Sequence, residues 1–254
     1  MTIFLHELKR GWLALLIWSV AIAWMLGLTA MIFPIIMEEM KEMEDLFASL
    51  GLEGMFTDDF LGYFASEYTE LLGLGGGIYA ALTAIAALAG EENNHTAEFL
   101  LTHPVSRNRV VTEKAISVFA RITVLNFVAA LVSTVAAFAI GEEFDFGKLM
   151  LIALSVYILQ IEIVAVCLMV SAVLPKGGTA IALGVTIGGY FINIISLASK
   201  DLEWLKYVTP FSYASGSYIN ENGAIELPCL IIGLAVTALS IAVTYLYYNK
   251  KEIK

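Results

Sequence analysis

Six long apolar runs alternate with shorter polar segments along this chain. Each run holds 20 or more residues, and a helix of about 20 residues covers the roughly 30 Å hydrocarbon layer of a bilayer. Because every backbone N–H and C=O inside lipid needs an internal partner, the pattern predicts six transmembrane helices. They are expected at Gly11–Ile36, Leu71–Gly90, Ala115–Ile140, Leu149–Leu174, Gly177–Ser199 and Leu227–Tyr248.

Composition agrees with an all-α polytopic membrane protein. The 254 residues are 59% hydrophobic and 15% charged, against about 25% charged residues in soluble domains. The polar segments are too short to fold as separate soluble domains. We therefore expect one transmembrane domain over residues 1–254, with outer segments 37–70 and 200–226. Cys167 and Cys229 both fall in apolar runs, and no Cys/His spacing typical of a metal site is present.

The distribution of Lys and Arg predicts the orientation. If the N-terminus is inside, the outer segments, counted with the short loop 141–148, carry only Lys41, Lys148, Lys200 and Lys206, and the inner segments carry nine Lys or Arg. Cytoplasmic loops are enriched in these residues, so both termini are expected in the cytoplasm. Together with the loop 141–148, the outer segments hold 17 of the 24 carboxylates; this acidic face either raises the local concentration of cations or is an ordinary solvated face. The small size favours a prokaryotic inner membrane.

Two polar segments are expected to form short interfacial structure. Residues 1–10 place Ile3, Phe4 and Leu8 near one helical face, which fits a helix lying in the membrane interface; a simple extension of the first span is the alternative. Residues 200–226 are rich in aromatic residues that suit headgroup level. That segment either folds back into the bundle or forms an ordinary interfacial loop.

The segment 91–114, between the second and third spans, carries most of the functional information. Pro104 should end a short helix, and Ser106 can cap a second helix that begins at Arg107. The short helix would display Phe99, Leu100 and Leu101 beside charged residues. Apolar side chains exposed outside the bilayer need a partner. The segment is therefore a candidate docking site for a cytoplasmic protein.

The residues of this segment resemble a known family pattern. The candidate coupling residues are Glu91, Glu92, Thr96, Glu98, Phe99, Leu100, Leu101, Pro104, Arg107, Arg109 and Lys114. With Val105 and Ser106 they are similar to a stretch in permease subunits of ABC-2 type transporters, although Thr96 stands where many members have Gly. Six spans, inside termini and Pro210-Phe211 before the last span extend the resemblance over nearly the whole chain.

The resemblance implies a mechanism. In that family the segment is a coupling helix seated in a cleft of an ATP-binding subunit. Two permeases, identical or related, pair with two ATPase subunits, and ATP-driven closure repacks the spans for export. This chain lacks the G-x-x-x-x-G-K-[ST] phosphate-binding loop, so it is not expected to be an enzyme. It should bind no cofactor itself, and ATP and Mg are expected on the partner.

Polar residues inside the predicted spans are the candidates for a translocation path: Glu162, Gln160 and Asn193. A carboxylate at the middle of a span is costly and normally faces the bundle interior or water. Glu162 could be protonated and hydrogen-bonded, could pair with Arg121, or could line a substrate or ion path. The sequence alone leaves these three alternatives for Glu162 open.

Two other functions compete with the permease. One is a stand-alone secondary transporter or channel that uses Glu162, although no clear internal repeat is visible. The other is a membrane assembly subunit that moves no substrate. Co-purification of an ATPase would distinguish the permease from these two alternatives. The sequence does not specify the substrate.

Overall fold

The computed structural model describes residues 2–49, 59–93, 106–174 and 178–250. Within these ranges, six helical segments are long and apolar enough to cross a membrane, which confirms the predicted class. The first span is α1 (Thr2–Ser49), and the second is α2 (Phe60–Tyr68), η1 (Thr69–Gly75) and α3 (Gly76–Asn93) in continuous succession. The other four are α5 (Arg107–Ile140), α6 (Phe146–Val173), α7 (Gly178–Ala198) and α9 (Leu227–Lys250).

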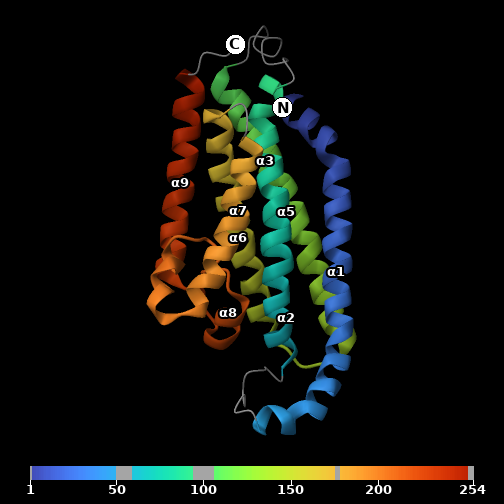
Figure 1. Ribbon diagram of the computed structural model, residues 1–254. Helices are drawn as coiled ribbons and strands as arrows, with labels where there is room; N and C mark the ends of the chain where they lie inside the picture. Colours follow the sequence, from blue (N-terminus) through green and yellow to red (C-terminus); the bar gives the residue numbers. More distant parts are fainter. Residues whose placement is uncertain (1, 50–58, 94–105, 175–177, 251–254) are drawn as a thin grey trace.

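The spans form an elongated bundle (Figure 1). α1 begins and α9 ends at the same end of the bundle, which we call the terminal end. α3 ends and α5 begins at this end too, so the chain between them connects two spans here. The 3₁₀ helix η2 (Lys200–Tyr207) and α8 (Gly216–Asn222) lie toward the other end, which we call the distal end.

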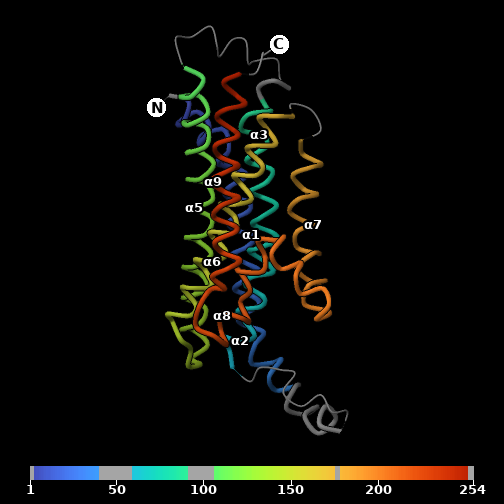
Figure 2. Tube along the Cα trace, turned by 90° about the vertical axis from the view of Figure 1, so that its left-hand side faces the viewer, coloured from blue at the N-terminus to red at the C-terminus, as the bar shows by residue number. Residues whose placement is uncertain are grey.

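The centre of the bundle is formed by α3 and α6. Within an 18-residue apolar stretch of each span, 67% is buried in the second span and 61% in α6, against 22% in α1, α7 and α9. α1 packs on α5, α9 packs on α6, and α7 packs on α3 and η2. Figure 2 shows α7 at one side of the bundle. The outer helices expose large apolar side chains, such as Trp24, Phe127 and Phe191, which suits contact with lipid.

Short polar side chains define several helix starts. The Ser106 hydroxyl accepts a hydrogen bond from the backbone N–H of Arg109 (3.4 Å), which confirms the predicted cap of α5. Asp59 and Asp145 cap α2 and α6 in the same way. Such caps satisfy N–H groups that have no partner within the helix. Gly141 ends α5 at φ 79°, a left-handed conformation that glycine adopts without strain.

The first two spans are longer than expected. α1 is continuous from Thr2, so residues 2–10 extend the first span instead of forming a separate helix, and its first turns are inclined to the rest (Figure 1). Pro34 lies inside α1 and does not end it. The helical segment that contains the second span begins at Phe60, eleven residues before the predicted start at Leu71. It covers more of the outer segment 37–70 than the hydropathy pattern indicated.

A π-helix, η1, interrupts the second span and ends within a run of glycines, Gly73 to Gly77. A Cβ at Gly76 would collide with the Gln160 amide, and one at Gly77 would lie 3.1 Å from Ile163 and 3.2 Å from Thr186. The glycines thus let α3 approach α6 and α7 closely, as glycines commonly do between membrane helices.

The distal segment between α7 and α9 folds back against the bundle. Phe211 and Tyr213 are buried, with exposed fractions of 2% and 1%. The Thr209 hydroxyl donates to the carbonyl of Gly189 in α7 (2.7 Å), and Lys148 of α6 donates to the carbonyl of Asn220 in α8 (2.6 Å). Of the two expectations for this segment, the structure therefore favours the inward fold.

Candidate functional site

A buried ion pair joins three helices near the terminal end. Lys114 of α5 is fully buried, and its Nζ donates to Glu7 Oε1 of α1 (3.3 Å) and to the carbonyl of Ala87 in α3 (2.5 Å). Glu7 is 5% exposed. Lys114 therefore links α1, α3 and α5 inside the bundle, and its predicted role in coupling to an ATPase stays a prediction.

Glu113, one residue earlier, ties α5 to the start of α1. Its Oε2 accepts hydrogen bonds from the backbone N–H groups of Ile3 (3.1 Å) and Phe4 (3.2 Å), and Oε1 accepts from Arg109 (2.8 Å). A carboxylate at a helix N-terminus meets otherwise unpaired N–H groups and the positive end of the helix dipole. The Arg109 side chain remains 57% exposed, so it is available at the surface.

Arg107 ties α5 to the end of α9. Its Nη1 donates to the carbonyls of Tyr248 (3.4 Å) and Asn249 (3.1 Å). A cation is favourable there because the last carbonyls of a helix lack partners within it. Two of the three described coupling candidates, Arg107 and Lys114, thus bind the first turns of α5 to neighbouring helices, whereas Arg109 pairs with Glu113 within α5.

The other coupling candidates are described only in part. The backbone of Glu91 and Glu92 belongs to the last turns of α3. Thr96, Glu98, Phe99, Leu100, Leu101 and Pro104 lie outside the described residues. Their predicted role in coupling therefore stays a prediction.

Glu162 occupies a second candidate site, at the middle of α6. It is 6% exposed, and its Oε2 accepts a hydrogen bond from the Tyr213 hydroxyl (2.8 Å). Burial and the nearby carboxyl raise the pKa of Tyr213 above its ordinary value, so the phenol keeps the proton that it donates. Gly233 of α9 makes room for this contact, because a Cβ there would collide with the Glu162 carboxyl.

Arg121 and Glu162 do not pair. Arg121 lies against Gly11 of α1 and donates to the carbonyl of Ser117 (3.3 Å), whereas Glu162 faces α9 and the distal segment. The two side chains belong to different contacts of the bundle, so of the three alternatives for Glu162 the structure does not support pairing with Arg121.

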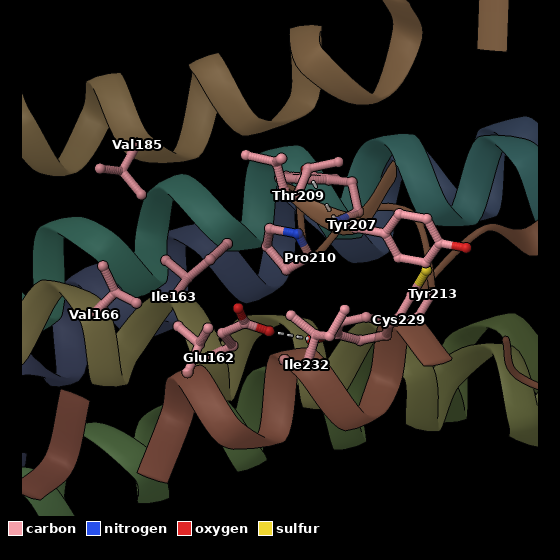
Figure 3. A pocket seen from close by; sticks show the side chains of 14 residues that line it. Glu162, Ile163, Val166, Val185, Tyr207, Thr209, Pro210, Tyr213, Cys229 and Ile232 are labelled. Atoms are coloured by element: carbon pink, nitrogen blue, oxygen red, sulfur yellow. Dashed lines mark hydrogen bonds between the residues drawn. The ribbon is translucent and has the colours of Figure 1, made fainter. Parts of the chain in front are cut away.

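A pocket of about 220 Å³ opens beside Glu162. It lies between α6, α7, α9 and residues 207–213 of the distal segment (Figure 3). Its lining residues are Glu162, Ile163, Val166, Val185, Tyr207, Val208, Thr209, Pro210, Phe211, Tyr213, Cys229, Ile232, Gly233 and Val236. The pocket therefore combines one carboxyl group with apolar and aromatic walls.

Lys206 holds the distal wall of this pocket in place. Its Nζ lies 2.9 Å from Glu226 Oε1 and 2.9 Å from Glu203 Oε1. The hydrogen bonds that Lys206 donates to Glu226 and Glu203 raise the pKa of Lys206, and the bond that Glu203 accepts lowers the pKa of Glu203. Because Glu226 directly precedes α9, this cluster fastens η2 to the start of the last span.

Gln160 and Asn193, the other two path candidates, lie elsewhere. Gln160 is fully buried; its Nε2 donates to the carbonyl of Leu72 in η1 (2.7 Å), and its Oε1 accepts from Asn126 of α5 (2.7 Å). Asn193 lines a separate polar pocket beside Lys200 and Ser196. The structure therefore does not join the three candidates in one path. Of these three candidates, only Glu162 lines the pocket of about 220 Å³.

Replacing Gln160 with Leu should lower the stability of the bundle without changing the arrangement of its helices. The substitution leaves the Leu72 carbonyl and the Asn126 amide without the partner that Gln160 provides, and an unsatisfied buried polar group costs about 1–3 kcal/mol. Unfolding of the purified protein in detergent, followed by circular dichroism, measures the loss. An unchanged transition would show that the Leu72 carbonyl does not depend on this bond.

Tyr213 was missed as a site residue by sequence reasoning. Aromatic residues gather at headgroup level, and that position and an inward fold both remain open for Tyr213 from the sequence. Its buried contact with Glu162 spans 51 residues of sequence. The sequence pointed toward this contact only through the alternative in which residues 200–226 fold back into the bundle.

Comparison with known families agrees with this geometry. The model of the family described as "ABC-2 family transporter protein" matches residues 1–253, which is nearly the whole chain. No curated protein matches the chain.

Proposed function

We propose that this chain, which belongs to the ABC-2 family of transporter proteins, couples ATP hydrolysis by a partner ATPase to the export of a substrate. The match over residues 1–253 carries the proposal. In the complex, two ATPase subunits, which bind ATP and Mg, serve two permeases, the second being a copy or a relative of this chain. The Lys and Arg distribution supports a cytoplasmic terminal end.

The contacts at the terminal end support a route for the coupling. The chain between α3 and α5 leaves both helices at that end. Lys114 then binds α5 to α1 and α3, and Arg107 binds it to α9. A force applied to this connection therefore reaches four helices through the first turns of α5. Packed elements transmit such displacements when they have two discrete arrangements.

Co-purification tests the proposal. Tagged protein extracted from its native membrane in mild detergent is expected to bring down an ABC ATPase. The triple variant F99D/L100D/L101D should lose that ATPase, because three carboxylates cannot enter an apolar cleft without a large desolvation cost.

The matched control is I253D, which adds a carboxylate near the C-terminus and should keep the ATPase. Capture of the ATPase by the triple variant at the wild-type level would contradict the assigned contact. Absence of an ATPase from the wild-type preparation would contradict the proposed function.

A further inference from the structure

We propose that the pocket beside Glu162 binds a small organic cation, such as an aryl or alkyl ammonium ion. The charge would rest on the Glu162 carboxylate, and the apolar part would pack between Val185, Phe211 and Ile232. The inference deepens the proposed function, since it names a class of substrate. The binding itself requires only this chain.

The Glu162 carboxyl group has one hydrogen-bonded oxygen among the described residues. Tyr213 donates to Oε2, no described side chain donates to Oε1, and the Glu162 side chain lines the pocket. Figure 3 shows the carboxyl group at the pocket wall contributed by α6, with the dashed bond on one oxygen only. A carboxylate buried at this depth requires a compensating positive charge to stay ionised.

No basic side chain among the described residues fills that position. The fourteen pocket residues include one acid and no Lys, Arg or His. Arg121 packs against Gly11 on α1, and Lys206 is bound to Glu226 and Glu203. Among the described residues, the position of the positive charge that would match an ionised Glu162 is therefore left for a ligand to take.

The walls select an organic cation over a metal ion. Ca²⁺ and Mg²⁺ need about six or more oxygen ligands, whereas the pocket offers one carboxylate. Within the described ranges, no group of three His, Cys, Asp or Glu is placed to hold a metal. Aliphatic walls and the rings of Tyr207, Phe211 and Tyr213 instead suit an apolar body and a cation over an aromatic face.

The volume limits the size of the ligand. A pocket of about 220 Å³ holds about seven water molecules at about 30 Å³ each, which is the bulk of a small aryl ammonium ion. Drug-sized ligands fill about 300–1,000 Å³. Benzyltrimethylammonium is therefore a suitable probe. Neopentylbenzene has the same shape without the charge.

Binding of tritiated benzyltrimethylammonium to the purified chain in detergent tests the proposal. The wild type should bind the cation, and excess neopentylbenzene should not displace it. E162Q should weaken binding at least tenfold. E162D, which keeps the charge on a shorter side chain, should bind more tightly than E162Q. E221Q removes a carboxylate from exposed α8, outside the pocket, and should bind like the wild type.

Several results would overturn the proposal: no binding by the wild type, wild-type affinity in E162Q, equal loss in E162D and E162Q, or displacement by the neutral compound. Equal weakening in E221Q would assign binding to the acidic surface instead. If the wild type fails to bind the cation but still co-purifies with an ATPase, this inference fails and the proposed function stands.

Discussion

Replacing Lys114 with Met should destabilise the protein by about 3–5 kcal/mol, the usual cost of removing one partner from a buried ion pair. Met fills much of the volume of Lys114, but its apolar side chain cannot donate a hydrogen bond to the buried Glu7 carboxylate. It also removes the donor to the Ala87 carbonyl. Unfolding by a denaturing detergent, followed by circular dichroism, measures the change in free energy.

The double variant E7Q/K114M provides the control. Replacing both charges removes the unpaired carboxylate, and such replacements are often close to neutral. The double variant should therefore recover more than half of the stability that K114M loses. A K114M protein within about 0.5 kcal/mol of the wild type, the range of ordinary surface substitutions, would contradict the structural role assigned to Lys114.

Replacing Gly216 with Ala should separate α8 from α2. A Cβ at Gly216 would collide with the Ala65 carbonyl oxygen and lie 2.8 Å from Thr69 Oγ1. Since the first obstacle is backbone, no rotamer change relieves it. The Thr69–Ala214 and Ser66–Ser217 hydrogen bonds lie at the same contact. We expect a loss of about 1–3 kcal/mol or more, as for other overpacked sites.

Gly27→Ala is the matched control for Gly216→Ala. Nothing lies within 4 Å of a Cβ at Gly27 in α1. Alanine at that helical position should be neutral or should stabilise the protein by up to about 1 kcal/mol. Thermal unfolding of the two variants, measured side by side in one detergent, separates them. Equal transitions for G216A and G27A would show that α8 does not pack on α2 as described.

The sequence predicted the number and order of the spans because each apolar run matches the thickness of a bilayer. It predicted the start of α5 because Ser106 is a short polar residue followed by a helical pattern, and the structure confirms that cap. It did not predict η1. A π-helix has no distinct hydropathy signal, and the adjacent glycines indicated close packing only.

The hydropathy pattern along the chain does not predict contacts between residues that are distant in the sequence. Lys114 reads as one more cation near the membrane surface, and only the packing of α1 and α3 around α5 shows that it faces Glu7, 107 residues away. Glu162 was recognised because a lone carboxylate in an apolar run is costly. Its partner Tyr213 required knowledge of how the distal segment folds back.

Photo-crosslinking from position 99 tests most directly whether the connection between α3 and α5 contacts an ATPase. Phe99 is replaced by a photoreactive benzoyl-phenylalanine, cells are irradiated, and the crosslinked product is identified by mass spectrometry. We expect a crosslink to an ABC ATPase subunit, lost when the partner is deleted. Crosslinks confined to lipid or to this chain's own helices, with the ATPase present, would contradict the coupling role.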